Sequence, residues 1–287
     1  MPQERLGIAR RAYAEELRAT APVRDNERVV EAFATVPRER FLGPGPWKIL
    51  PGPRPAVSYV TSDADPARLY HDILVPLDES QEINNGQPSL WAYMFDQLDA
   101  RPGERVMQVG AGTGYYTAIL AELVGREGHV TAVEYDSVLA AKAIRNLEPW
   151  SQVKLVHGDA ATVDPSGVDM IVAFAGLTHP MPLWLDRLLD GGRMMIGLTA
   201  TDWWGFMLLA TRTGEAFHAR SLGSCGIVPF VGRDEEAGDR LGKALKRLKG
   251  KDVPIASMHR GNPPPDAGRE VWHRGPGYWL SRRAIST

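Results

Sequence analysis

Cysteine and long apolar runs are the features that this sequence lacks most clearly. Its 287 residues include one cysteine, so no disulfide can form within the chain, and a reducing compartment such as the cytoplasm is the expected location. No stretch approaches the ~18 apolar residues that a membrane span needs. The N-terminal residues 1–20 are charged throughout and lack the apolar core of a signal peptide. We therefore expect a cytoplasmic protein with no membrane partner.

A strong excess of charge of either sign is also missing. The formal net charge is -2 at pH 7, so no strong field would draw the chain to nucleic acid, and no nucleic-acid partner is expected. Hydrophobic residues make up 44% and charged residues 24% of the chain, which is ordinary for a globular protein with a core. At roughly 150 residues per domain, the length allows one large domain or two small ones. The oligomeric state is left open.

Strands and helices alternate from residue 105 onward. Short apolar runs predict strands over 105–110, 129–134, 153–157, 168–175 and 193–198, and longer patterned runs predict helices over 115–124, 137–147 and 182–189. Such alternation implies parallel strands joined by right-handed crossovers. Residues 206–211 and 216–221 flank a Thr213-Gly214 turn and predict an antiparallel hairpin. The pattern therefore indicates an α/β protein with a Rossmann-like sheet.

The segments outside this alternating region are less regular. Helices are predicted over 8–19, 26–35 and 234–249, an irregular Pro- and Gly-rich loop over 43–55, a linker over 262–265, and a final strand or hairpin over 271–280. We expect three parts: an N-terminal helical and loop region (1–80) on the substrate side, a cofactor-binding core (81–232) and a C-terminal extension (233–287). The tryptophans of the last part of the chain could pack the extension onto the core or line a substrate groove.

A glycine-rich loop is the most informative segment. It runs Gly110-Ala111-Gly112-Thr113-Gly114-Tyr115 between a predicted strand and a predicted helix. Glycines let a backbone approach a ligand closely, and a helix N-terminus offers unpaired N–H groups. Dinucleotide sites need a small residue where Tyr115 stands, because the helix packs closely on the strand there. The G-x-G-x-G spacing is typical instead of S-adenosylmethionine sites, with a purely structural turn as the alternative.

Two acidic residues follow the next two strands. Glu134, followed by Tyr135, ends the second strand, where a carboxylate can accept hydrogen bonds from both ribose hydroxyls. Asp159, in Gly158-Asp159-Ala160, follows the third strand and could bind the adenine amino group. A solvated strand-end carboxylate and a turn aspartate are the alternatives. With the glycine loop, these residues indicate S-adenosylmethionine as cofactor and S-adenosylhomocysteine as product.

Other chemically active residue types give weaker indications. The histidines and acids show no metal-ligand spacing, so no metal site is expected. His179 is expected in a surface loop, although substrates often lie near such a position in this architecture. Cys225 lies in an apolar run and is expected in the core rather than as a nucleophile.

Short motifs on both sides of the glycine loop follow one another in a characteristic order. They are Val36-Pro37-Arg38-Glu39-Arg40-Phe41, Tyr70-His71-Asp72, Gln87-Pro88, the glycine loop, Glu134, Gly158-Asp159 and Val228-Pro229-Phe230. In this order they resemble the protein-L-isoaspartate O-methyltransferase family over residues 28–232. The resemblance implies a class I methyltransferase fold, with a central, mostly parallel seven-stranded sheet, a C-terminal antiparallel hairpin and helices on both faces. It also implies methyl transfer to the misplaced carboxylate of isoaspartyl residues.

The segment that resembles the family's acceptor motif departs from the family pattern. The family's T-I-S-Q-P aligns with Asn84-Asn85-Gly86-Gln87-Pro88, so Asn84 replaces the threonine and Gly86 the serine. The residues expected to contact the methyl acceptor are Asn84, Asn85, Gln87 and Ser89, with Asp72 nearby. The alternative is a turn and helix cap with Pro88 at the first helical position.

A carboxylate acceptor needs no general base, because its ordinary pKa of about 4 leaves it ionised at neutral pH. Alignment and a dry site are enough. The leading hypothesis is therefore carboxyl O-methylation of an aspartate- or isoaspartate-type carboxylate, with a peptide, a protein or a small carboxylate as the acceptor. The alternatives are a methyltransferase of the same fold that acts on a small acid, a biosynthetic peptide or a nitrogen nucleophile, and a non-catalytic S-adenosylmethionine-binding protein.

Overall fold

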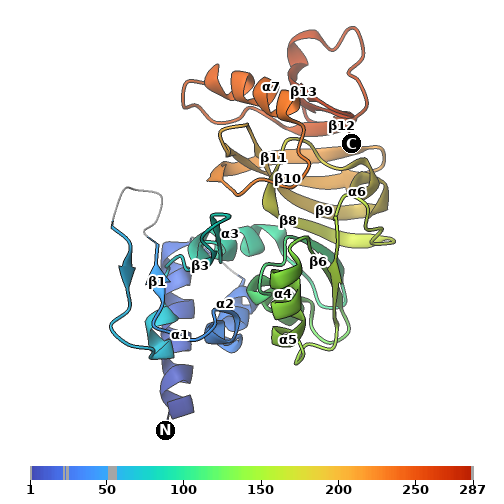
Figure 1. The fold of residues 1–287 in the computed structure, drawn as a ribbon. Helices are drawn as coiled ribbons and strands as arrows, with labels where there is room; N and C mark the ends of the chain where they lie inside the picture. The colour runs from blue at the N-terminus through green and yellow to red at the C-terminus, as the bar shows by residue number, and fades with distance from the viewer. Residues whose placement is uncertain (1, 22, 24–25, 51–56, 286–287) are drawn as a thin grey trace. The chain divides into compact units, whose positions relative to one another are not determined.

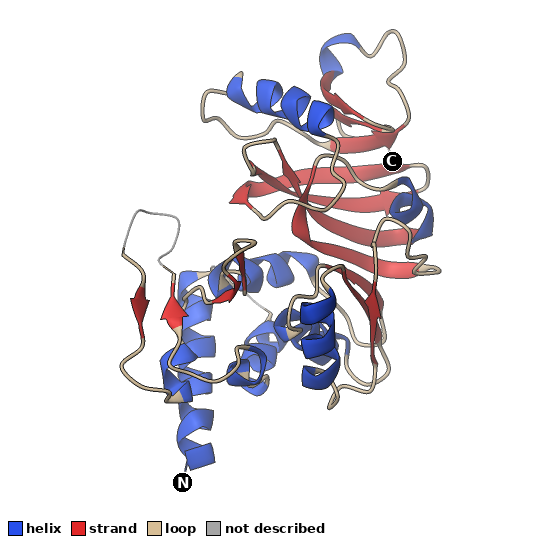
Figure 2. Cartoon of the chain, viewed as in Figure 1, coloured by secondary structure: helices blue, strands red, loops and turns tan. Residues whose placement is uncertain are grey.

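The structure is a computed structural model that describes residues 2–21, 23, 26–50 and 57–285. The chain forms two compact units (Figure 1). The first unit holds residues 1–104 and 111–157, and the second holds residues 105–110 and 158–287. Figure 2 shows that helices predominate in the first stretch of the chain and strands in its later part.

Three helices of the first unit pack against one another. They are α1 (Pro2–Thr20), α2 (Glu27–Thr35) and α3 (Pro88–Leu98). The predictions of helices over 8–19 and 26–35 are confirmed. Helix α2 ends at Thr35, and Val36 is extended because the proline that follows it disfavours helical backbone at that position. Phe33 on α2 is buried and meets Tyr13 and Phe95 at aromatic centroid distances of 6.2 and 6.4 Å.

Short elements connect α2 to α3 in the same unit. In chain order they are η1 (Arg38–Phe41), β1 (Lys48–Ile49), β2 (Tyr59–Val60), η2 (Pro66–Leu69), β3 (Pro76–Asp78) and β4 (Ile83–Asn84). Strand β1 pairs antiparallel with β2, and β3 pairs antiparallel with β4. The irregular loop predicted over 43–55 therefore contains one short strand, and its residues 51–55 lie outside the described part of the chain.

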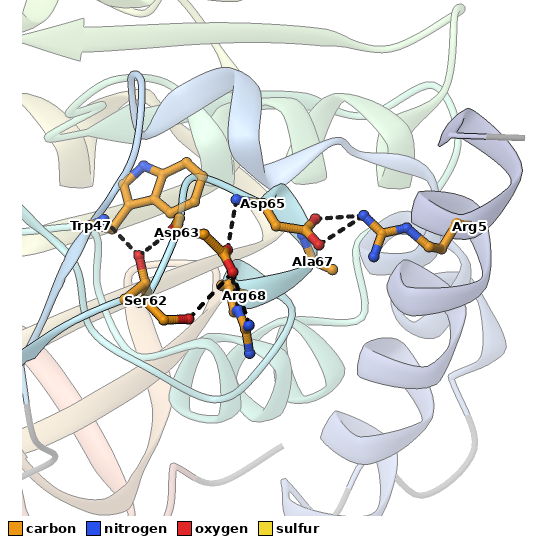
Figure 3. Close-up of polar contacts among 8 residues, drawn as sticks. Arg5, Trp47, Ser62, Asp63, Asp65, Ala67 and Arg68 are labelled. Atoms are coloured by element: carbon orange, nitrogen blue, oxygen red, sulfur yellow. Dashed lines mark hydrogen bonds and ion pairs between the residues drawn. The ribbon is translucent and has the colours of Figure 1, made fainter.

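Polar contacts hold the segment around η2 against α1 (Figure 3). Asp65 accepts hydrogen bonds from the Arg5 guanidinium on α1, at 2.7 and 2.8 Å, and caps η2 by accepting from the backbone N–H of Ala67 at 3.1 Å. Asp63 accepts from Arg68 at 3.0 Å. These contacts fix the start of the chain segment that continues into Tyr70-His71-Asp72.

The remainder of the first unit alternates helix and strand as predicted. Its elements are α4 (Tyr115–Val124), β6 (His129–Glu134), α5 (Ser137–Asn146) and β7 (Val153–His157). Strands β6 and β7 are parallel, with Val130 opposite Val153. Helix α5 begins after Asp136, whose carboxylate accepts from the N–H groups of Val138 and Leu139, both at 2.8 Å, as an N-cap residue does.

The described residues of the second unit form eight strands. They are β5 (Arg105–Val109), β8 (Val168–Leu177), β9 (Leu188–Thr199), β10 (Trp204–Thr213), β11 (Ala216–Gly226), β12 (Ser257–Arg260), β13 (Val271–Gly275) and β14 (Tyr278–Ser281). Their spatial order is β13-β14-β12-β11-β10-β9-β8-β5. The pairs β5·β8 and β8·β9 are parallel, and the other pairs are antiparallel. The predicted hairpin β10–β11 and the predicted hairpin near the C-terminus are confirmed.

The α/β fold class is confirmed, but the sheet of this unit is more antiparallel than predicted. The reason is that the C-terminal segment adds β12, β14 and β13 to the edge of β11, which leaves that edge paired rather than exposed. Helix α6 (Pro182–Arg187) lies between β8 and β9 in the chain, and η3 (Gly268–Glu270) precedes β13. Helix α7 (Glu235–Lys246) packs on β13 and β9.

Four tryptophans in the later part of the second unit divide into two groups. Trp279 is buried and stacks on His259 at a centroid distance of 4.2 Å, while Trp272 meets Phe206 edge-on at 5.8 Å. These two rings pack within the extended sheet, as large aromatic side chains usually do. Trp203, just before β10, and Trp204, its first residue, remain partly exposed. Among the described residues, no helix combines the length and apolarity that crossing a membrane would require.

Candidate functional site

The glycine loop joins β5 to the start of α4. Gly112 and Gly114 have φ angles of +58° and +100°, a region that residues with a side chain rarely adopt. A Cβ on Gly114 would lie 2.9 Å from the Leu147 side chain. The N–H of Gly114 donates to the Ala111 carbonyl at 2.9 Å, and the N–H of Ala111 donates to the Val133 carbonyl of β6 at 3.2 Å. The loop thus needs glycine both for its conformation and for its close packing.

Glu134, at the end of β6, turns its carboxylate toward this loop. Its Oε2 accepts from the Gly112 N–H at 2.6 Å, and its Oε1 accepts from the Asp136 N–H at 2.9 Å. The residue is 8% exposed. Burial raises the pKa of the carboxyl, and the two backbone N–H groups oppose that shift. Since each carboxylate oxygen can accept more than one hydrogen bond, the group is oriented by the loop and still has capacity for the hydroxyls of a ribose.

The other loop residues of the first unit serve mainly to support this arrangement. Tyr115 is buried, with its ring 5.6 Å from that of Phe41, and Thr113 is buried with its carbonyl accepting from the Asn146 amide at 2.9 Å. Tyr135, by contrast, is exposed. Positive-φ glycines, a helix N-terminus and an oriented buried carboxylate fit the adenosyl part of S-adenosylmethionine.

The residues predicted to bind adenine lie in the second unit. Asp159 accepts from the N–H of Ala161 at 2.9 Å through its carboxylate, and its carbonyl accepts from the Thr162 hydroxyl at 2.9 Å. The carbonyl of buried Ala160 accepts from the indole N–H of Trp184 on α6 at 2.9 Å. Gly158 has open space where a Cβ would stand. Asp159 is therefore held in a firm turn at the start of this unit's main segment.

The acceptor segment, residues 84–89, lies in the first unit and is fixed by its own amides. Asn84 Oδ1 accepts from the Gly86 N–H at 2.8 Å, which forms a tight turn. Asn85 is buried, and its Oδ1 accepts from the Val75 N–H at 2.6 Å while its own N–H donates to the Val75 carbonyl at 3.0 Å. The two asparagines therefore shape the backbone that leads into α3.

Asp72 joins the acceptor segment to the preceding motif. Its Oδ2 accepts from the Gln87 side-chain amide at 3.1 Å, and its Oδ1 accepts from the Ser89 N–H at 2.8 Å. Ser89 is the second residue of α3, after Pro88. Asp72 thus caps α3 from 17 residues away, a role that no local pattern in the sequence indicates. The structure brings Asp72, Gln87 and Ser89 together, and their contact with a methyl acceptor stays a prediction.

Gly86 occupies the position at which the family motif has serine. Its φ is +74°, and a Cβ there would lie 2.8 Å from the indole nitrogen of Trp91. Its carbonyl accepts from the hydroxyl of Tyr116 at 3.0 Å. The backbone at Gly86 is thus packed directly against aromatic side chains of α3 and α4, where a serine side chain has no room.

Sequence reasoning identified the motif around Arg38 but gave the residue no role. Arg38 is fully buried, and its guanidinium donates to the carbonyls of Leu69 at 2.5 Å, His71 at 2.6 Å and Ile73 at 2.5 Å. The guanidinium carbon lies 5.6 Å from the centre of the Tyr13 ring. An arginine between Pro37 and Glu39 in a short charged motif looks exposed in the sequence, and only its spatial partners distinguish it.

Solved structures share this fold. A protein-L-isoaspartate O-methyltransferase matches with a TM-score of 0.64 at 23% identity, covering 88% of this chain and 73% of that one. A second, from Plasmodium falciparum, is described as a putative enzyme of this kind in complex with S-adenosyl-L-homocysteine; it matches with a TM-score of 0.60 at 17% identity, covering 77% and 97%. At such identities the likeness establishes the fold. Fold and glycine loop together define a class I methyltransferase.

Sequence comparison identifies the family within that class. The model of the Protein-L-isoaspartate(D-aspartate) O-methyltransferase family matches residues 55–235. A protein-L-isoaspartate O-methyltransferase of Methanopyrus kandleri is 32% identical over 231 residues, covering 79% of this chain and 92% of the relative. One of Methanothrix thermoacetophila is 34% identical over 215 residues, covering 72% and 90%. The chain belongs to this family, and it is an S-adenosylmethionine-dependent O-methyltransferase.

Proposed function

We propose that this protein methylates the free carboxylate of isoaspartyl residues in peptides or proteins. The observation that carries the proposal is the contact of Asp72 with Gln87 and Ser89 at 3.1 and 2.8 Å. This contact joins the motif around Asp72 to residues 84–89, in which Asn84 and Gly86 replace the family's threonine and serine, and it supports a common role of the two motifs at the acceptor. Membership of the family supports the same substrate class.

We assign the methyl donor to the glycine loop and the two strand-end acids. The proposed donor-binding residues are Gly110, Ala111, Gly112, Thr113, Gly114, Tyr115, Glu134, Tyr135, Gly158, Asp159 and Ala160. In this scheme Glu134 accepts from the ribose hydroxyls, a role supported by its orientation at 2.6 Å from the Gly112 N–H. Asp159 receives the adenine amino group. The donor supplies an electrophilic methyl group on a positively charged sulfur.

The acceptor is assigned to the side chains of the acceptor segment. Asn84, Asn85, Gln87 and Ser89 would contact it, and Asp72 would orient them. A carboxylate acceptor is already ionised at neutral pH, so its oxygen lone pair would form the new O–C bond without a general base, while the methyl C–S bond of the donor breaks and its electron pair leaves with S-adenosylhomocysteine. The work left to these residues is to align the carboxylate and to exclude water. This explains why no catalytic dyad is needed among them.

The wider organisation follows from the same proposal. Residues 1–80 would lie on the substrate side, residues 81–232 would form the methyltransferase core, and residues 233–287 would be an extension of it. A cytoplasmic location is part of the same proposal, because a chain with a single cysteine, Cys225, forms no internal disulfide and so suits a reducing compartment.

The test is labelled methyl transfer from S-adenosylmethionine to two matched peptides, one with isoaspartate and one with normal aspartate at the same position. Methyl esters release methanol in base, so base-labile label identifies a carboxyl product. Label on the isoaspartyl peptide alone is the expected result. A reaction without peptide measures self-methylation and serves as the blank.

Two results would count against the proposal. Equal labelling of both peptides would show an O-methyltransferase without isoaspartyl selectivity. No label on either peptide, in a sample that binds S-adenosylhomocysteine by calorimetry, would leave the donor site intact and would move the search to small acids, other peptides or nitrogen nucleophiles.

A further inference from the structure

Arg38 is a buried cation that the proposed chemistry does not use directly. None of its surface is exposed. Burying a charged side chain is costly unless hydrogen bonds replace the water that it loses. Its guanidinium is also over two aromatic rings, those of Tyr13 and Tyr115, at 5.6 and 6.0 Å, which adds favourable cation–π contacts. An apolar side chain would serve equally well for packing alone, so the buried guanidinium of Arg38 indicates a further role.

The hydrogen bonds of Arg38 converge on one short piece of backbone. The carbonyls that it binds belong to Leu69, His71 and Ile73, at 2.5 to 2.6 Å. They stand on both sides of Asp72 in the chain. The guanidinium fork is rigid, so three such bonds fix the path of this backbone more firmly than a flexible ammonium would.

The other end of the same segment is anchored independently. Asp65 accepts from Arg5 on α1 at 2.7 and 2.8 Å, as Figure 3 shows. Tyr70 receives a hydrogen bond on its hydroxyl from Arg10 at 3.0 Å, and that hydroxyl donates to Glu39. With Arg38 bound to the carbonyls on either side of it, Asp72 has little freedom to move away from Gln87 and Ser89.

Charge gives Arg38 a second effect at the same place. The Asp72 carboxylate stands beside the segment that would receive an anionic acceptor, and like charges repel in a poorly solvated site. Its oxygens are committed to the Gln87 amide and the Ser89 N–H. The Arg38 guanidinium, which binds the carbonyls of the two neighbouring residues, carries the opposite charge.

We propose that Arg38 is a positioning residue for the methyl acceptor: it holds Asp72 in place, and through Asp72 it orients Gln87 and the start of α3. This inference rests on the proposed function, because it assumes that the acceptor meets residues 84–89. The role is specific to the acceptor. Binding of the methyl donor is assigned to other residues, and Arg38 meets only one of them, Tyr115, through its ring at 6.0 Å, so donor binding should change much less than acceptor binding when Arg38 is replaced.

The experiment compares Arg38→Lys with Arg212→Lys, in the full-length protein. Arg212 is a matched control, because its guanidinium also donates to backbone carbonyls, those of Gly214, Leu185 and Leu188, at 3.0, 3.3 and 2.6 Å. It lies in the second unit. Asp72→Asn and the Arg38→Lys/Asp72→Asn double variant complete a double-mutant cycle. Arg38→Met replaces Arg38→Lys in a second such cycle and removes the positive charge.

For Arg38→Lys we expect kcat/KM for the isoaspartyl peptide to fall by roughly ten- to a hundredfold, the range that small misplacements of reacting groups cause. The fall should come largely from a higher KM for the peptide. The affinity for S-adenosylhomocysteine should change by less than about twofold, and Arg212→Lys should behave as the wild type. In the Asp72→Asn background the same substitution should cost much less, because residues that act through each other are not additive. Fully multiplicative losses would show that Arg38 acts independently of Asp72 and would overturn the proposal.

Hydrogen exchange supplies a readout that does not depend on turnover. Loss of the Asp72 contact should speed exchange of the Ser89 amide in Arg38→Lys and leave it unchanged in Arg212→Lys. Unchanged exchange in Arg38→Lys would refute the positioning role even if activity fell. A wild-type protein that does not label the isoaspartyl peptide would refute the proposed function instead, and the Ser89 exchange rate would still decide whether Arg38 holds Asp72.

Discussion

The carboxylate of Glu134 is the sharpest test of how the donor site works. Glu134→Gln keeps the size of the side chain and removes its charge. The carboxylate accepts from Gly112 at 2.6 Å and from Asp136 at 2.9 Å. An amide has one oxygen, so in the variant one of these N–H groups faces an NH2 group instead of an acceptor. The same loss applies to the two ribose hydroxyls that the carboxylate is proposed to bind.

The size of the effect follows from the hydrogen bonds involved. A hydrogen bond to a charged group contributes about 1.5–3 kcal/mol. Replacing two charged contacts to ribose by one neutral contact should therefore cost the complex about 2–3 kcal/mol, which is a roughly 30- to 150-fold weaker affinity. Because burial raises the pKa of Glu134, the wild-type affinity should also fall on acidification through that pKa, and the variant should lack this dependence.

Calorimetric titration with S-adenosylhomocysteine measures the affinity without turnover. The control is Glu122→Gln on α4, an exposed acid that accepts from the Trp150 indole at 2.7 Å, and it should bind like the wild type. Cooperative thermal unfolding of both variants would show that they are folded. A dissociation constant for Glu134→Gln within threefold of wild type, with its pH dependence intact, would refute the assignment of Glu134 to the ribose.

Two further predictions concern stability. Gly86→Ser, which restores the family residue, should destabilise the protein by about 2 kcal/mol or more in denaturant unfolding. A side chain at φ +74° is strained, and its Cβ would lie 2.8 Å from the Trp91 indole nitrogen. An unchanged free energy of unfolding together with higher activity would contradict this packing argument. His273 has its pKa lowered from 6.5 to about 4, mainly by burial and also by Arg240. The unfolded chain therefore takes up the proton first, and about 2 kcal/mol of stability should be lost between about pH 7 and pH 5. His273→Phe should remove most of that loss, and parallel pH curves for the two proteins would show that His273 is not its source.

Local sequence patterns predicted the elements around the donor site closely. Helix α4 and strands β6 and β7 have the predicted bounds, because their short apolar runs are bounded by glycine or by a polar turn on each side. The glycines of the loop could be identified for the same reason. Their conformation is a property of the residue, and Gly112 and Gly114 do have positive φ.

The acceptor side depended on contacts that no local pattern encodes. Asp72 caps a helix that begins 16 positions later in the chain, and Arg38 binds carbonyls more than 30 positions away. The added strands of the second unit are a similar case, since β12 joins β11 only because both present a free edge in the folded chain. Residues paired over such distances leave no periodic trace in a single sequence.

The sequence by itself determined the order of strands and helices, the glycine loop with its acid at the end of β6, and membership of a methyltransferase family. These depend on properties of neighbouring residues: apolar period, turn chemistry and the conformational freedom of glycine. Only the tertiary structure decided that Arg38 is buried and bound to the carbonyls on both sides of Asp72, and that Gly86 leaves no space for the family's serine. Burial and packing depend on which residues folding brings together, and the order of residues along the chain does not specify the distances between residues that are far apart in it.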